Sequence, residues 1–243
     1  MLNQELSDAA EIHYGFLPRK YSDENVKIAV SLRPHHYVGG DYCNVIPLSN
    51  NKMVACMCDV AGHGISSALF AARINTFVAA HSHISHCPCE LITALNQFMC
   101  ERFMSTRVLT TFYAAFFDFQ TQQVFYVGAG HPPMLHYKNK THSVAELASI
   151  TTPIGVGHPL PVQCQVTELA FEPDDRFFLY TDGVNESRNA DKELFGLERL
   201  SDFILANTKL PVHEYNAALM KTLSEFNDDK FLDDLLLMSM HIK

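Results

Sequence analysis

Aspartate recurs along this chain at the end of apolar runs, beside glycine or a second aspartate. Asp59 follows the six apolar residues 53–58 and precedes Gly62 and Gly64. The matching sites are Gly39-Gly40-Asp41, Thr181-Asp182-Gly183 and Asp233-Asp234. A carboxylate at a strand end beside a glycine turn suits a hard cation, although one such aspartate alone more often caps a helix or forms a turn. The recurrence is what indicates a site.

These aspartates can converge only through the fold, and their mutual repulsion would then require protonation or cations. All-oxygen ligands select Mg²⁺, Mn²⁺ or Ca²⁺ rather than zinc. Two such ions about 3.5–4 Å apart would suit in-line displacement at phosphorus by a metal-bound hydroxide. The pattern therefore favours metal-assisted phosphoryl chemistry.

Composition narrows the class of protein. A chain of 243 residues makes one large domain or two small ones, and 47% hydrophobic residues can bury a substantial core. The net charge of -9 disfavours a nucleic-acid partner. The sequence contains no run of about 18 apolar residues, so no membrane-spanning helix is expected. The polar, acidic start of the sequence does not resemble a secretory signal. The apolar surroundings of Cys56, Cys58 and Cys100 predict reduced, buried thiols in a cytoplasmic protein.

Periodicity predicts strands in hairpins and helices in consecutive pairs. The apolar run 53–58 is typical of a strand buried on both faces. Expected helices cover residues 4–16, 65–84, 88–104, 193–207 and 211–226, the first ended by Pro18. Expected strands cover residues 26–32, 45–48, 52–58, 110–118, 123–127, 134–137, 164–171, 176–180 and 235–242, with turns or loops at 49–51, 128–133 and 153–157. This order fits sheets flanked by helix layers better than a βαβ winding.

Five motifs together carry a resemblance to a known family. They are residues 38–42, 59–64, 128–133, 180–184 and 233–234. In this order they resemble the metal-dependent protein phosphatases of the protein phosphatase 2C superfamily, in its bacterial sporulation and stress-response branch (SpoIIE/RsbU type). The resemblance extends from about residue 10 to the C-terminus. It implies an α+β fold, a four-layer α-β-β-α sandwich of two antiparallel sheets flanked by helix pairs. It also implies a phosphatase domain over 19–243, preceded by a linker or regulatory helix over 1–18.

The implied activity is removal of phosphate from phosphoserine or phosphothreonine in a regulatory protein, typically an anti-sigma-factor antagonist, with two Mn²⁺ or Mg²⁺ ions. Branch members often carry an upstream sensor or receiver domain. A catalytically silent relative that only binds a partner is the alternative, and the intact aspartates argue against it. A phosphoesterase for small molecules ranks last, because no obvious nucleotide-binding loop is present.

Site residues are carried over position by position. The implied metal ligands are Asp41, Asp59, the Val60 carbonyl, Asp182 and Asp233. The implied supporting neighbours are Gly40, Gly62, Gly183 and Asp234. Asp41 and Asp59 are also expected to act in catalysis through the ions. His63 is a candidate general acid, with a site-wall or hydrogen-bonding role as the alternative.

The chain departs from the branch at several positions. Asn44 stands where an aspartate is usual, which puts an accessory third metal in doubt. Leu236 replaces a usual Thr or Ser, and Asn185 replaces a usual Thr. None of these changes removes a principal carboxylate.

Other polar residues receive more ordinary interpretations. His131 is expected to hydrogen-bond its own turn. Arg33 suits phosphate geometry, but a solvated surface arginine is the favoured reading. The His- and Cys-rich residues 81–89 superficially resemble a soft-metal site, and an exposed interhelix loop is favoured.

The opening helix has an apolar stripe that must be buried somewhere, because a short helix is marginal alone in water. It either packs on its own domain or pairs with the same helix of a second copy. We expect a weak homodimer through this helix.

Overall fold

The computed structural model describes residues 2–103 and 108–243, and these form two compact units. The first unit contains Met1–Leu17, Tyr37–Pro132 and Ala148–Phe171, and the second contains Pro18–His36, Pro133–Leu147 and Glu172–Lys243. The chain passes between the units more than once, so each unit is assembled from segments far apart in sequence. Position 104, the end expected for one helix, lies outside the described residues.

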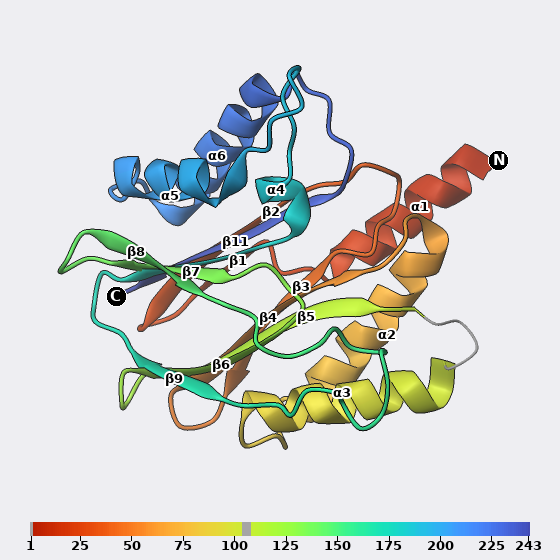
Figure 1. The fold of residues 1–243 in the computed structure, drawn as a ribbon, viewed down its shortest axis with the longest axis horizontal. Coiled ribbons are helices and arrows are strands. Elements are labelled where there is room, and N and C mark those ends of the chain that lie inside the picture. The colour runs from red at the N-terminus through yellow and green to blue at the C-terminus, as the bar shows by residue number, and fades with distance from the viewer. Residues whose placement is uncertain (1, 104–107) are drawn as a thin grey trace. The chain divides into compact units, whose positions relative to one another are not determined.

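The first unit is built on a five-stranded antiparallel sheet in the order β3-β4-β5-β6-β9. The strands are β3 (Tyr42–Leu48), β4 (Lys52–Val60), β5 (Thr110–Asp118), β6 (Gln123–Ala129) and β9 (Thr167–Ala170). Its helices are α1 (Leu2–Gly15), α2 (Ile65–His81) and α3 (Pro88–Phe103). Helix α2 packs on β3 and β4, and α3 packs on β5 and β6, so both helices cover this sheet (Figure 1).

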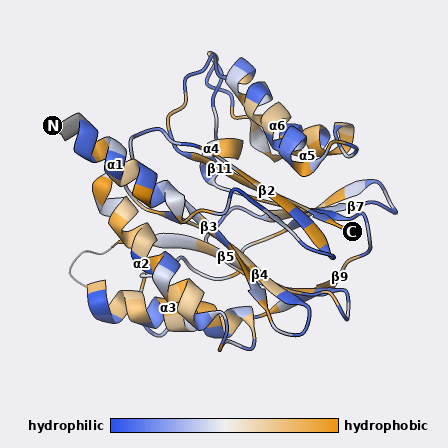
Figure 2. Cartoon of the chain, turned by 180° about the vertical axis from the view of Figure 1, so that it is seen from behind, coloured by the Kyte–Doolittle hydropathy of each residue, from blue (hydrophilic) through white to orange (hydrophobic). Residues whose placement is uncertain are grey.

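The central strand of this sheet behaves as its sequence predicts. Residues 53–58 are each at most 1% exposed, because β4 lies between β3 and β5 and its apolar side chains are covered on both faces. Helix α2 carries hydrophobic residues around much of its surface (Figure 2). The packed strand β4 thus gives Asp59 and Val60, at its C-terminal end, a rigid support.

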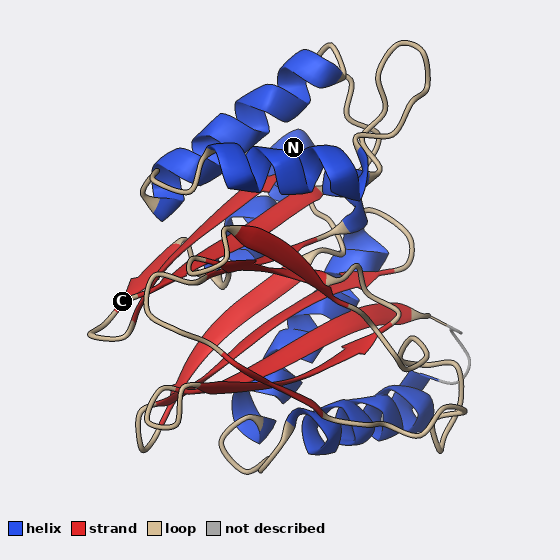
Figure 3. Cartoon of the chain, turned by 60° about the vertical axis from the view of Figure 1, so that its left-hand side comes forward, coloured by secondary structure: helices blue, strands red, loops and turns tan. Residues whose placement is uncertain are grey.

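The second unit is built on a six-stranded antiparallel sheet in the order β1-β2-β11-β10-β7-β8. The strands are β1 (Lys20–Ser22), β2 (Val26–Arg33), β7 (Met134–Lys138), β8 (Ser143–Leu147), β10 (Arg176–Tyr180) and β11 (Leu235–Ile242). Its helices are α4 (Asp182–Asn185), α5 (Gly196–Ala206) and α6 (Val212–Phe226). Helix α6 packs on β2 and β11, and α5 on β7 and β8, which places this helix pair over its sheet (Figure 3).

The two antiparallel sheets with their helices confirm the expected α+β class. The differences from expectation are local. Strands β1 and β8 and the short helix α4 were not expected from the sequence, and β9 is shorter than the predicted strand over 164–171. Helix α5 begins at Gly196 rather than at 193 because residues 188–194 form a closed loop, with a bridge between Arg188 and Leu194. None of the described helices has the length and apolar character that crossing a bilayer requires.

The cysteines divide into two groups. Cys56 and Cys58 are free and buried, as expected, whereas the free Cys100 is only half-buried. Cys89 and Cys164 form a disulfide that links the first turn of α3 to the segment before β9. The three cysteines on which the expectation of reduced thiols was based are all free. The sequence analysis did not predict the disulfide between Cys89 and Cys164.

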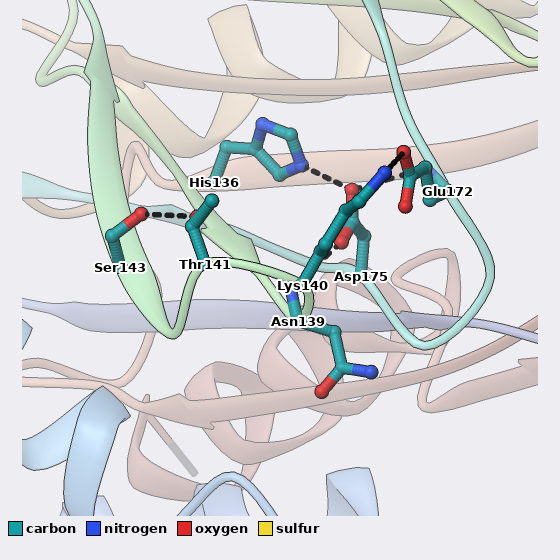
Figure 4. A network of polar contacts seen from close by, with 7 residues as sticks. All are labelled: His136, Asn139, Lys140, Thr141, Ser143, Glu172 and Asp175. Atoms are coloured by element: carbon teal, nitrogen blue, oxygen red, sulfur yellow. Dashed lines mark hydrogen bonds and ion pairs between the residues drawn. The ribbon is translucent and has the colours of Figure 1, made fainter.

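A buried hydrogen-bonded contact between His136 and Asp175 joins β7 to the turn before β10 in the second unit (Figure 4). His136 Nε2 lies 2.8 Å from Asp175 Oδ2, and these side chains are only 1% and 5% exposed. The Asp175 carboxylate also accepts hydrogen bonds from the backbone N–H groups of Asn139 and Glu172, at 2.9 and 3.0 Å. Burial opposes ionisation of Asp175, but these hydrogen bonds outweigh it and hold the pKa of the carboxyl below its ordinary value.

We expect Asp175→Asn to lower the free energy of unfolding at pH 7 by about 3 kcal/mol, because it breaks a buried pair. A carboxyl with a lowered folded-state pKa stabilises the protein above its unfolded pKa of about 3.9, and this contribution is lost as the pH falls further. The difference in the free energy of unfolding between wild type and Asp175→Asn should therefore decrease as the pH falls from 5 to 3. Urea unfolding across that range measures it.

Asp174→Asn is the matched control, because the Asp174 side chain is 67% exposed where it meets His241 and should change stability little. Equal stability of Asp175→Asn and wild type at pH 7, or a gap that stays constant down to pH 3, would contradict this account.

Candidate metal centre

In the first unit, Asp41 and Asp59 stand on adjacent strands. Asp41 directly precedes β3 and is 5% exposed, while Asp59 is the penultimate residue of β4 and is half-buried. Tyr42, next to Asp41, pairs with Cys58, next to Asp59. The antiparallel register thus brings the first two predicted carboxylates to the same end of the β3–β4 pair. The strand runs one residue beyond Asp59, so the aspartate lies within it rather than after it.

Gly40 packs directly against the predicted backbone ligand. A Cβ added at Gly40 would lie 2.6 Å from the Val60 carbonyl oxygen and 3.1 Å from Ser67 Cβ. Real Cβ atoms do not approach a carbonyl that closely, so only glycine permits this contact between the Asp41 loop and the end of β4. The Val60 carbonyl therefore lies beside the loop that carries Asp41.

The turn after β4 has the backbone that its glycines were expected to allow. Gly62 and Gly64 have φ angles of 102° and 79°, in the region that other residues rarely adopt. Gly64 then leads into α2, and its carbonyl accepts a hydrogen bond from Ser67 Oγ at 2.9 Å. His63 lies exposed between these glycines, and its role as general acid stays a prediction.

A threonine that sequence reasoning missed supports Asp59. Thr111 lies opposite Asp59 on β5, and its Oγ1 accepts a hydrogen bond from the Asp59 N–H at 3.3 Å. The same hydroxyl lies 2.7 Å from His131 Nδ1. The His131 carbonyl accepts a hydrogen bond from Ser149 Oγ, at 2.5 Å. His131 therefore acts as a structural residue whose contacts reach the backbone of Asp59.

In the second unit, Asp182 opens α4 at the end of β10. The preceding residue, Thr181, joins the start of β11 through two hydrogen bonds. Its N–H donates to the Leu236 carbonyl, and its Oγ1 accepts from the Leu236 N–H, at 3.0 and 3.1 Å. Burial, with the neighbouring charges of Asp233 and Glu186, raises the pKa of Asp182.

Gly183 allows β11 to approach this turn closely. A Cβ at this position would overlap the Asp234 carbonyl oxygen, so the backbone of α4 and the Asp233-Asp234 pair meet only because Gly183 has no side chain. The structure therefore brings Asp182 and the acidic pair together within the second unit.

The two members of the acidic pair have different surroundings. Asp234 is buried, and its Oδ1 accepts a hydrogen bond from the His35 N–H at 2.6 Å. Burial raises the pKa of Asp234, against the effect of that hydrogen bond. Asp233 is exposed, and its Oδ1 accepts a hydrogen bond from the Asp234 N–H at 2.9 Å. Asp233 is therefore the more accessible carboxylate of the pair, and the roles of ligand and supporting neighbour stay predictions.

In each unit, the residues assigned as ligands have the chemical type that a hard divalent cation requires. Every assigned donor is an oxygen, from carboxylates and one backbone carbonyl, which is the set that Mg²⁺ and Mn²⁺ prefer. The raised pKa of Asp182 reflects negative charge crowded in a partly buried place, and a bound cation would relieve it. Over residues 2–103 and 108–243, no three His, Cys, Asp or Glu side chains form a ready metal-binding group.

Other candidate residues have structural partners. Asn44 donates to Asn75 Oδ1 at 3.2 Å and accepts from the Val45 N–H at 2.8 Å, so its amide is held within the first unit. Arg33 remains partly solvated, with 43% of its side chain exposed, and it also bonds Ser224 and lies 3.9 Å over the ring of Phe231.

Most of the His- and Cys-rich tract 81–89 forms the expected interhelix loop, and only its ends belong to helices α2 and α3. His81 ends α2 and stacks on Phe77, with ring centroids 3.7 Å apart. Cys89 lies in α3 and pairs with Cys164, and α2 ends three residues earlier than expected, so the interhelix loop covers residues 82–87.

Comparison with known proteins places the chain in a family. Residues 49–243 match the family model described as "Stage II sporulation protein E (SpoIIE)". The chain belongs to the SpoIIE family. The resemblance inferred from the five motifs, to protein phosphatase 2C-type proteins of the sporulation and stress-response branch, is thereby confirmed.

Among its relatives, the phosphoserine phosphatase RsbP of Bacillus subtilis is 26% identical over 184 residues, which cover 74% of this chain and 45% of RsbP. The chain thus spans less than half the length of that relative. The SiaA-PP2C domain of Pseudomonas aeruginosa has the same fold, with a TM-score of 0.85 at 20% identity over 100% of this chain and 97% of that domain. RsbX, solved in complex with magnesium, gives a TM-score of 0.70 at 15% identity over 92% and 98% of the two chains.

Proposed function

We propose that this SpoIIE-family chain is a metal-dependent serine/threonine protein phosphatase. The observation that carries the proposal is a group of assigned oxygen donors in each unit. Asp41, Asp59 and the Val60 carbonyl lie together in the first unit, and Asp182 with Asp233 lies in the second. The kinship with a phosphoserine phosphatase supports serine as the phosphorylated residue.

The assigned ligands would hold two Mn²⁺ or Mg²⁺ ions. Bound there, such ions supply Lewis acidity toward the phosphoryl group and acidify a water molecule for in-line attack. The chain's own part is to hold its donors in place. Thr111 and His131 fix the backbone of Asp59, Gly40 lets Asp41 approach Val60, and Gly183 lets Asp233 approach Asp182. His63, which is exposed in the turn after Asp59 and Val60, is the candidate donor of a proton to the leaving serine oxygen.

The test is hydrolysis of an aryl phosphate with purified protein. We expect turnover with millimolar Mn²⁺ or Mg²⁺ and none in chelator, because carboxylate sites select hard ions. Full activity in chelator, or activation by zinc alone, would exclude the proposal. A folded protein without turnover under any of these ions would favour the alternative, a silent domain that binds a partner.

The regulatory setting is part of the proposal. The substrate class is a phosphorylated regulatory protein of the anti-sigma-factor antagonist type, in the cytoplasm, with residues 19–243 as the phosphatase domain. The chain spans less than half of RsbP, so an upstream sensor or receiver domain, joined through α1 as the linker or regulatory helix, is part of the proposal. Dephosphorylation of a candidate antagonist, followed by mass spectrometry of its phosphoserine, tests this assignment.

We also propose that α1 pairs with a second copy of the chain. Helix α1 borders an apolar groove of about 410 Å³ that it shares with α2, and His13, which is buried, lines this groove too. Ile12, Ile65 and Leu69 line this groove and are 75%, 57% and 63% exposed. A second α1–α2 pair is self-complementary to such a surface and closes it by twofold symmetry.

We expect Ile12→Glu to shift the protein toward monomer in sedimentation velocity and to lower the phosphatase rate at concentrations where wild type dimerises. The reason is that a charge on the groove opposes burial of its apolar surface. Ile84→Glu is the control, since Ile84 is 67% exposed and does not line the groove. A wild-type protein that is monomeric at all concentrations would remove the proposal.

A further inference from the structure

A small recess opens beside Asp182 and Asp233 in the second unit. Its volume is about 130 Å³, and Asp182, Gly183 and Asp233 form one side of it. The remaining lining residues come from the segment after α4 and from the segment before β11: Glu186, Ser187, Arg188, Lys230, Phe231 and Leu232. A group bound in this recess would therefore lie next to the carboxylates assigned to the metal.

One wall of the recess is a loop held by its own hydrogen bonds. Arg188 begins the closed loop that ends at Leu194. Inside the loop, Asn189 Oδ1 accepts from the N–H groups of Asp191 and Glu193 at 3.0 and 2.9 Å. Ser187 Oγ donates to the Gly183 carbonyl at 2.7 Å, which joins the loop to α4. Arg188 is thus carried by an ordered support.

The facing wall is held by Arg33. Its guanidinium lies 3.9 Å over the Phe231 ring, and it also bonds Ser224 and Asp229, at 2.8 and 3.3 Å. Lys230 precedes Phe231, and its N–H donates to the Asn227 carbonyl at 3.0 Å. The backbone that presents Lys230 is therefore fixed on both sides.

The two cations of the recess are available for a ligand. Across residues 2–103 and 108–243, neither Arg188 nor Lys230 takes part in an ion pair. Arg188 Nη1 donates one long hydrogen bond, at 3.4 Å, to the Lys192 carbonyl of its own loop, which leaves its other guanidinium donors for a ligand. With a divalent ion on Asp182 and Asp233, the charged residues left in the recess are Arg188, Lys230 and Glu186, so positive charge is in excess. The chain as a whole is acidic, with a net charge of -9, so this local excess runs against the general composition.

We propose that the recess is a specificity subsite that receives an acidic side chain next to the phosphoserine of the substrate. This inference rests on the proposed phosphatase function. Pockets that enclose small molecules usually measure about 300–1,000 Å³, so this smaller recess suits a single side chain. Arg188 and Lys230 bind the carboxylate by charge-assisted hydrogen bonds, while Phe231 and Leu232 contact the aliphatic part of the side chain or the neighbouring peptide.

The test compares two phosphoserine peptides that differ only in their flanking residues, glutamate in one and glutamine in the other. Wild type should prefer the glutamate peptide through a lower KM, and added salt should weaken this preference. Lys230→Glu and Arg188→Glu should each raise the KM for the glutamate peptide roughly five- to tenfold, with kcat and aryl-phosphate hydrolysis unchanged. Lys209→Glu is the control, because it makes the same charge change outside the recess.

Binding provides a readout that does not depend on turnover. A fluorescent glutamate peptide should bind to Asp59→Asn protein in Mn²⁺ more tightly than the glutamine peptide, and Lys230→Glu should remove the difference in anisotropy titrations. Equal affinity for both peptides overturns the subsite. A parallel rise in the aryl-phosphate KM overturns it too, because the cations would then bind the phosphate itself. Absence of all hydrolysis with the binding preference retained would remove the phosphatase proposal and leave the subsite as a binding site.

Discussion

Asp182→Asn is expected to abolish most turnover while leaving the protein folded. The substitution keeps the shape of the side chain but removes the charge of an assigned metal ligand, and we expect a loss of roughly 10²–10⁴-fold under saturating Mn²⁺. Stability without metal should hold or rise, because burial and the charges of Asp233 and Glu186 already disfavour the Asp182 carboxylate, as its raised pKa indicates. Phosphate release and thermal melting in chelator measure the two effects.

The control for this prediction is Asp191→Asn. Asp191 is exposed in the loop after α4, and it contributes only its backbone N–H to Asn189. It should change neither turnover nor melting temperature. Near wild-type turnover of Asp182→Asn under saturating Mn²⁺ would refute the ligand assignment, and a lower melting temperature in chelator would refute the electrostatic argument.

Gly40→Ala is the second substitution with a large expected effect. The new methyl group would lie 2.6 Å from the Val60 carbonyl oxygen, so the Asp41 loop and the end of β4 must move apart. Overpacking of this kind costs about 1–3 kcal/mol. The same movement separates Asp41 from the assigned Val60 ligand, so we expect the Mn²⁺ concentration for half-maximal turnover to rise at least about tenfold. Activity titrated with Mn²⁺, together with urea unfolding, gives both numbers.

Gly157→Ala separates this effect from the general cost of replacing glycine. A Cβ at Gly157 would have no described atom within 4 Å, so stability and Mn²⁺ dependence should stay near wild type. If Gly40→Ala matches Gly157→Ala in both measurements, the close contact between Gly40 and Val60 does not support the site.

The fold could be predicted where the sequence pattern is strongly periodic or uninterrupted. Strands β4, β5, β10 and β11 follow apolar runs that only a packed sheet can bury. The short strands β1 and β8 were missed because the alternation of apolar and polar residues in them is brief and their side chains are little buried. They are strands because they pair with β2 and β7. Tertiary pairing decides such segments, and local composition carries little of that information.

The site could be predicted in its carboxylates but not in their supports. Asp59 and Asp182 stand beside glycines in a recognisable pattern, whereas Thr111 becomes relevant only through the register that sets it opposite Asp59. A register is not readable from one strand alone. The pairing of Cys89 with Cys164 likewise depends on how α3 meets the segment before β9, a contact between residues 75 apart in sequence.

The central claim is that Asp182 and Asp233, both in the second unit, act together as one metal-binding group. The most direct test measures phosphate release from a phosphoserine peptide in Mn²⁺ by wild type, Asp182→Asn, Asp233→Asn and the double variant. Residues that act as a unit show strongly non-additive losses, so each single substitution should remove nearly all turnover and the double variant should be no worse than either. Wild-type turnover in one single variant, or losses that multiply in the double variant, would contradict the claim.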